Sequence, residues 1–152
     1  MSLEDVYEIE KLKYRYMRFL DTRAWDDFTD CFVPEATGDY AGLVFPNRDK
    51  LVSYMVKHMT EEMVSMHHAH HPEIEVDGDT ATGTWYLEDK VIFEKYSLYI
   101  EGASLYSDRY VRTPEGWKIA HTGYVRTYEM TRSMKNWDNL EMDTRPRKYA
   151  RD

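Results

Sequence analysis

The chain has 152 residues and a formal net charge of −8, from 28 acidic and 20 basic side chains. This length predicts a single domain. The acidic balance argues against nucleic-acid binding, which needs a concentrated basic face. No run approaches the ~20 apolar residues of a membrane span, and the acidic N-terminal sequence is unlike a signal peptide, so no membrane attachment is expected. The single cysteine, Cys31, excludes an intrachain disulfide and is typical of a reducing compartment, so we expect a cytoplasmic protein.

The N-terminal third of the chain predicts three helices. Apolar residues at three- and four-residue steps predict an amphipathic helix over Leu3–Leu20. A second, short helix is expected over Ala24–Phe32, ended by Pro34, and a strand over Thr37–Val44. Asn47 is the expected N-cap of the third helix.

From Met63 onward the apolar period changes to two, which predicts strands. A strand over Val64–Val76 meets a hairpin turn at Gly78, and the return strand continues to Phe93. A second pair of strands is expected over Gly102–Arg112 and Trp117–Tyr128.

Helices followed by long antiparallel strands predict an α+β domain over residues 1–130, with a polar tail over 131–152. In this domain one curved antiparallel sheet wraps around the three helices and encloses a cone-shaped cavity. The sequence contains no glycine-rich phosphate loop, so we expect no nucleotide cofactor.

Three residues with polar groups are unusual for their positions and are therefore candidates for function. Asp89 lies on the apolar face of the return strand, where a carboxylate needs a hydrogen-bonding partner or a proton. A structural pairing with Arg or Tyr explains it as well as catalysis does. Asp21 follows the first helix, where it opposes the helix dipole, and it is otherwise an exposed loop residue. Tyr16 belongs to the apolar stripe of that helix, as a core residue or a catalytic one.

A run of four histidines is the densest cluster of titratable residues. On a strand, His67 and His71 would face one way, and His68 and His70 the other. His68 and His70 give a metal only two ligands, so no metal site is expected. The preferred interpretation is one imidazole facing the cavity as a general base.

Arg126 lies on the last predicted strand. Regular pairing would place Tyr124 and Tyr128 on its face, unless Gly123 marks a bulge. Its guanidinium either binds a substrate carboxylate or pairs with Asp89 or Asp21.

These residues occur within runs that resemble a known family. The run KLKYRYMRFLDTRAWDDF resembles the first helix of SnoaL-like domains in the NTF2-like superfamily. Three further runs resemble bacterial bile-acid 7α-dehydratases: SMHHAHHPEIEVDGDTATGTWYLEDKVIF, GASLYSDRY and GWKIAHTGYVRTYE. The likeness extends from Glu8 to Glu129, and scytalone dehydratase and a hexachlorocyclohexane dehydrochlorinase are similar at the Asp and His positions. It implies the same cone-shaped α+β barrel.

The resemblance also implies a catalytic set, which is Tyr16, Asp21, His67, Asp89 and Arg126. His67 would abstract a proton while Asp21 orients it, and Tyr16 would stabilise the developing oxyanion. Asp89 would assist the departing hydroxyl, although Tyr16 and Asp89 could exchange these roles. Arg126 would orient groups or bind a carboxylate.

The implied activity is dehydration of a hydroxylated steroid or other apolar polycyclic substrate, free or as a thioester conjugate, without a cofactor. Two alternatives stay open: a non-catalytic ligand-binding or oligomerisation module, and a related isomerase or dehalogenase. A curved sheet rich in Tyr and Thr needs cover on its outer side, so a homotrimer or homodimer is expected.

Overall fold

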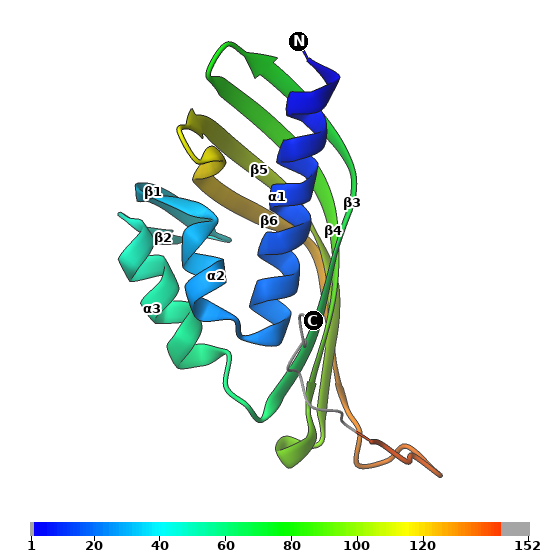
Figure 1. Ribbon diagram of the computed structural model, residues 1–152. Coiled ribbons are helices and arrows are strands. Elements are labelled where there is room, and N and C mark those ends of the chain that lie inside the picture. Colours follow the sequence, from blue (N-terminus) through cyan, green and yellow to red (C-terminus); the bar gives the residue numbers. More distant parts are fainter. Residues whose placement is uncertain (1, 144–152) are drawn as a thin grey trace.

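A computed structural model of the chain describes residues 2–143. Figure 1 shows α1 running along one face of a long curved sheet, with α2 and α3 beside the short strands β1 and β2. The elements in chain order are α1 (Leu3–Thr22), α2 (Trp25–Asp30), β1 (Phe32–Tyr40), β2 (Leu43–Phe45), α3 (Arg48–His58), β3 (Met63–Asp77), β4 (Thr80–Phe93), the 3₁₀-helix η1 (Glu94–Tyr96), β5 (Leu98–Thr113) and β6 (Gly116–Ser133).

The six strands form one unclosed sheet in the order β2-β1-β6-β5-β4-β3. Three helices and this curved sheet confirm the predicted cone-shaped α+β fold. The expectation of a wholly antiparallel sheet is wrong at one place, because β1 pairs parallel with β6. The long connection between β1 and β6, which contains α3 and strands β3–β5, allows this pairing, since the chain does not have to return through a tight hairpin.

The N-terminal elements differ from the prediction at two boundaries. Helix α2 ends at Asp30, two residues before its predicted end at Phe32, because Phe32 pairs with Ile119 of β6 and begins β1. The predicted strand over Thr37–Val44 is a hairpin of β1 and β2. Its turn contains Ala41 and Gly42, both with positive φ, which a continuous strand cannot contain. Asn47 caps α3 as predicted.

A bulge divides β3 into two halves of opposite parity. Between the pairs His70–Tyr86 and Glu73–Thr84, two residues of β3 oppose the single residue Trp85. The ring of His71 therefore lies against Tyr86, at 5.0 Å between centroids. The prediction that His71 shares a face with His67 is wrong for this reason.

A second bulge lies in β6, between the pairs Ala103–Tyr128 and Ser104–Arg126. Thr127 is the extra residue, so the expected bulge at Gly123 is not the one that changes parity here. Arg126 keeps the inward face, whereas Tyr128 turns outward and is half exposed. Strand β6 continues to Ser133, so residues 131–133 of the predicted tail belong to the sheet. Residues 144–152 of that tail lie outside the described residues.

The core between α1 and the sheet contains a buried ion pair. Lys13 Nζ lies 2.7 Å from Asp108 Oδ2, and both side chains are fully buried. The Tyr110 hydroxyl donates to the same carboxylate oxygen at 2.8 Å. The ammonium also lies over the rings of Tyr16 and Tyr106, 4.5 and 4.0 Å from their centroids. Burial lowers the pKa of Lys13, and the carboxylate of Asp108 opposes this shift.

The outer face of the sheet exposes a row of apolar side chains that includes Tyr86 and Val125. The homo-oligomer expected from the sequence stays a prediction. No helix between residues 2 and 143 is long and apolar enough to span a membrane.

Replacing Lys13 tests the buried pair. We expect Lys13→Met to lower the free energy of unfolding by about 3–5 kcal/mol, because it leaves the Asp108 carboxylate buried without its cation. Urea denaturation followed by circular dichroism measures this change. The matched control is Lys11→Met, which removes an exposed pair with Glu8 on the same helix and should cost at most about 1 kcal/mol. Equal stability of the two variants would contradict the role given to the pair.

Candidate active site

A cavity of about 340 Å³ lies between α1, α3 and the inner face of the sheet. Apolar side chains form much of its wall, and these are Leu20, Met55, Met59, Met63, Leu87, Val91, Phe93 and Ile100. Its polar lining consists of His67, Asp89, Arg126 and Glu129 from the strands, together with tyrosines. An apolar cavity with a few convergent polar groups is typical of a small-molecule site.

Asp21 and His67 form a hydrogen-bonded dyad at one side of this cavity. His67 Nδ1 lies 2.6 Å from Asp21 Oδ1, and the backbone N–H of His67 donates to Asp21 Oδ2 at 2.8 Å. Both side chains are largely buried. A carboxylate only accepts hydrogen bonds, so Nδ1 carries the proton and Nε2 is left as an acceptor. This is the arrangement of a general base with an orienting acid.

Arg23 and Ser65 fix the position of the Asp21 carboxylate. Ser65 Oγ donates to Asp21 Oδ1 at 2.8 Å. Arg23, which has the left-handed φ of 58° after the end of α1, donates to Ser65 Oγ and to the carbonyl oxygens of Leu20 and Asp21. It donates further to the carbonyls of Met59, which follows α3, and Met63, the first residue of β3. One guanidinium therefore connects the end of α1 to the start of β3.

A row of paired residues crosses the sheet beside the dyad. His67 of β3 pairs with Asp89 of β4, Asp89 with Gly102 of β5, and Gly102 with Glu129 of β6. The Arg126 guanidinium fills the space above Gly102, where a Cβ atom would collide with it. It donates two hydrogen bonds to Asp89 and lies 3.2 Å from Glu129 Oε2. The cation is thus held between two carboxylates.

The two tyrosines Tyr16 and Tyr40 meet at the wall of the cavity, with 2.6 Å between their hydroxyl oxygens. Burial raises the pKa of both phenols. Both therefore stay protonated near neutral pH. One hydroxyl donates to the other, which leaves one O–H of the pair to donate to a bound oxygen atom. The pair could serve as an oxyanion-stabilising donor.

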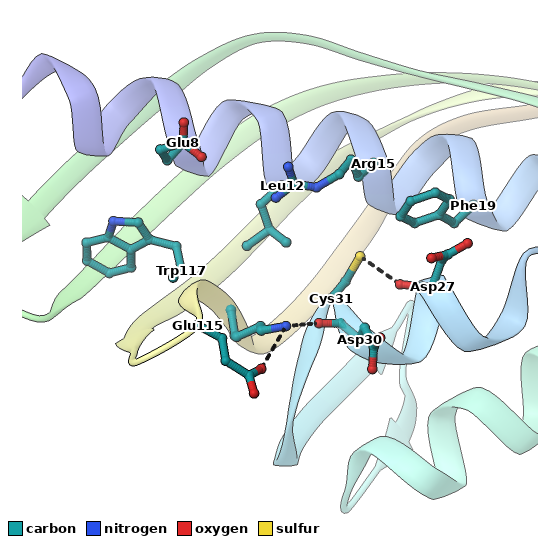
Figure 2. A pocket seen from close by; sticks show the side chains of 11 residues that line it. Glu8, Leu12, Arg15, Phe19, Asp27, Asp30, Cys31, Glu115 and Trp117 are labelled. Carbon is teal, nitrogen blue, oxygen red and sulfur yellow. Dashed lines mark hydrogen bonds and ion pairs between the residues drawn. The ribbon is translucent and has the colours of Figure 1, made fainter. Parts of the chain in front are cut away.

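A second cleft, of about 270 Å³, lies between α1, α2 and the turn from β5 to β6 (Figure 2). Lys118 partly closes it by donating to the carbonyl of Asp30 at 2.6 Å and by an ion pair with Glu115. Its one thiol, Cys31, has a pKa raised to about 12 by burial. A thiol in this state is a poor nucleophile, and the cleft offers no arrangement comparable to the dyad.

The structure brings together the five residues implied by the resemblance. Tyr16, His67, Asp89 and Arg126 line the cavity, and Asp21 lies directly behind His67. Sequence reasoning missed several residues of this region, which are Arg23, Tyr40, Ser65, Gly102 and Glu129. Of these, only Arg23 is near a candidate residue in the sequence, because it lies two residues after Asp21. The others come together through strand pairing between distant segments.

A family model described as the SnoaL-like domain matches residues 1–123. The chain belongs to the SnoaL-like domain family. An uncharacterised protein of Mycobacterium tuberculosis is 29% identical to it over 121 residues, which cover 78% of this chain and 82% of that relative.

Solved structures share this SnoaL-like fold. A scytalone dehydratase-like protein of Novosphingobium aromaticivorans superposes with a TM-score of 0.78 at 20% identity, covering 86% of this chain and 88% of that one. A hexachlorocyclohexane dehydrochlorinase of Novosphingobium barchaimii has a TM-score of 0.78 at 14% identity, with 94% and 97% covered. At these identities the likeness establishes the fold alone.

The tautomer of His67 is a prediction that needs no substrate. We expect ¹⁵N–¹H long-range correlation spectra to show neutral His67 with its proton on Nδ1, because Asp21 accepts it. Asp21→Asn should remove this preference, since an amide can also donate to Nδ1. The control is Asp26→Asn, an exposed carboxylate of α2 without contact to His67. A proton on Nε2 in the unmodified protein would contradict the proposed orientation of the dyad.

Proposed function

We propose that this SnoaL-like protein is a cofactor-independent lyase that removes water from a hydroxylated polycyclic substrate of the steroid class. The observation that carries the proposal is the 2.6 Å contact between His67 Nδ1 and Asp21 Oδ1, which leaves His67 Nε2 available as a base in a largely apolar cavity. The runs of this chain that resemble bile-acid 7α-dehydratases support the choice of a steroid substrate.

The proposed reaction begins at the carbon atom next to the one that carries the hydroxyl. His67 Nε2 takes a proton from this carbon, and Asp21 stabilises the imidazolium that forms. The C–H electron pair becomes the new carbon–carbon double bond as the C–O bond breaks. The departing hydroxide receives a proton from the imidazolium, so water leaves and His67 is regenerated. Every atom is balanced without an oxidant or a metal.

The hydrogen-bond donors of the cavity support this reaction in two ways. If the acidic proton lies next to a conjugated ketone, negative charge collects on the ketone oxygen, and the Tyr16–Tyr40 pair can donate to it. Arg126 is held by Asp89, Ser104 and Glu129, and its positive charge can stabilise the departing hydroxide. In this assignment Asp89 acts through Arg126, because its carboxylate is already occupied by the guanidinium. In the alternative assignment Tyr16 and Asp89 exchange roles, so that Tyr16 assists the departing hydroxyl and Asp89 stabilises the oxyanion.

The size of the cavity limits what it can enclose. Its volume of about 340 Å³ lies near the lower end of the ~300–1,000 Å³ common for ligand sites. The apolar wall suits fused rings, whereas a thioester conjugate would have to extend out of the cavity mouth. We therefore place the reacting ring inside and any conjugate outside.

Removal of the dyad is the first test of this proposal. The chain is incubated with a panel of hydroxylated steroid enones, and mass spectrometry detects loss of one water molecule. His67→Ala should lower the turnover of a competent substrate by about 10²–10⁴-fold. Asp21→Asn should also slow it, and the double variant should be scarcely slower than His67→Ala, because the two side chains act as a unit.

Circular dichroism of each variant controls for misfolding, since Asp21 also holds β3. Wild-type turnover by a folded His67→Ala variant would refute the mechanism. Saturable binding of the steroids without turnover by the unmodified protein would favour the ligand-binding module instead. Turnover without loss of water would favour an isomerase.

The tyrosine pair gives an independent kinetic prediction. Tyr16→Phe removes one hydroxyl and should lower the rate by about 10²–10³-fold, the usual cost of losing an oxyanion donor. Because this role is separate from proton removal, the defect should persist in the His67→Ala background. The matched control is Tyr14→Phe, because Tyr14 lies on the same helix but outside the cavity lining. A Tyr16→Phe variant with unchanged kinetics would assign the donor role to Tyr40 alone or to neither residue.

A further inference from the structure

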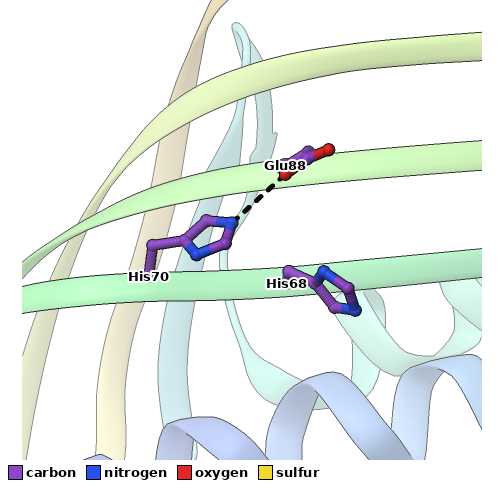
Figure 3. A group of neighbouring side chains, drawn as sticks. All are labelled: His68, His70 and Glu88. Carbon is purple, nitrogen blue, oxygen red and sulfur yellow. Dashed lines mark hydrogen bonds and ion pairs between the residues drawn. The ribbon is translucent and has the colours of Figure 1, made fainter.

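The outer face of the sheet carries a second group of histidines that the proposed reaction does not use. His68 and His70 alternate with His67 along β3, so they lie on the face opposite the cavity. Glu88 of β4 pairs directly with His68 and lies on the same outer face (Figure 3). The possible ligand atoms of these three side chains all lie within 4.8 Å of one another.

We propose that His68, His70 and Glu88 bind one divalent transition-metal ion of the zinc, nickel or copper type. Two imidazole nitrogens and one carboxylate oxygen are donors that suit these ions. A hard cation such as magnesium or calcium needs more oxygen ligands than one carboxylate provides. The strand pairing therefore supplies the third ligand that the spacing of His68 and His70 alone does not provide.

Two of the three side chains already lie at the separation expected of ligands around a bound metal ion. Tetrahedral zinc with bonds of about 2.0–2.1 Å separates its ligand atoms by about 3.4 Å. His70 Nε2 already lies 3.3 Å from Glu88 Oε2. The side chains of His70 and Glu88 are less than half exposed, at 43% and 44%, and rotation of His68 about its side-chain bonds can close the remaining distance. Solvent reaches the site, so water would complete the coordination shell.

Lys90 is the cation that competes for this site. Its Nζ lies 3.6 Å from Glu88 Oε1, on the same strand and the same face. A bound metal ion and the ammonium would repel one another across the carboxylate that they share. Removing the charge of Lys90 should therefore tighten metal binding.

The direct test uses the full chain without an affinity tag, stripped of metal with a chelator and then dialysed. Isothermal titration with zinc chloride should give one site per chain, and magnesium chloride should give none. His68→Gln, His70→Gln and Glu88→Gln should each weaken zinc binding about 10-fold or more. Loss of a group that only hydrogen-bonds to a metal ligand already lowers metal affinity by about that factor. Lys90→Gln should strengthen it.

Two histidine variants serve as matched controls. His71→Gln alters the same strand but leaves the three ligands in place, and His67→Gln alters the cavity face. Both should bind zinc as the unmodified chain does. Zinc binding that is lost in His67→Gln or kept in both His68→Gln and His70→Gln would overturn the proposal, as would the absence of saturable binding.

A spectroscopic measurement on the unmodified chain covers the case in which a variant fails to fold. Electron paramagnetic resonance of the chain with one equivalent of copper(II) should show coupling to two imidazole nitrogens. Coupling to one or none would contradict the ligand set.

Discussion

The carboxylate of Asp21 ties the end of α1 to strand β3, and the cavity exists in its present form because of this attachment. Strand β3 is an edge of the sheet, with a free side along which its backbone groups need partners. Asp21 supplies one partner by accepting the N–H of His67, and the imidazole bonds to the same carboxylate. Arg23 then fixes the helix end from which Asp21 projects. The Asp21 carboxylate therefore both positions the base and satisfies a backbone N–H at the edge of the sheet.

The sequence predicts the elements and the alternation of faces well, because both depend on local periodicity. Asp89 stands out on an apolar face for this reason, and alternation alone separates His67 from His68 and His70. Choosing His67 as the base, and Asp21 as its partner, depended on the resemblance to a family. No periodicity links residues 46 positions apart, since their contact arises only when α1 packs against β3.

The residues that sequence reasoning missed have identifiable physical causes. The extra residue Thr127 reverses parity within β6, so Glu129 faces the cavity although regular alternation from Arg126 would turn it outward. Tyr40 reaches Tyr16 because β1 joins the sheet through a parallel pairing with β6, and such a long-range pairing has no local sequence pattern. Glu88 becomes the third possible metal ligand only through the register of β3 and β4.

Gly102 sets the depth of the cavity at the Asp89–Arg126 pair. Because this residue has no side chain, the guanidinium occupies the space where a Cβ atom would lie. A Cβ atom at position 102 would collide with this guanidinium and would lie 2.6 Å from the carbonyl oxygen of Tyr128, so a larger residue would displace Arg126 and also disturb the pairing of β5 with β6. Glycine at this position thereby serves two functions, because it admits the guanidinium beside Asp89 and allows β5 and β6 to approach closely where the cavity needs its charged wall.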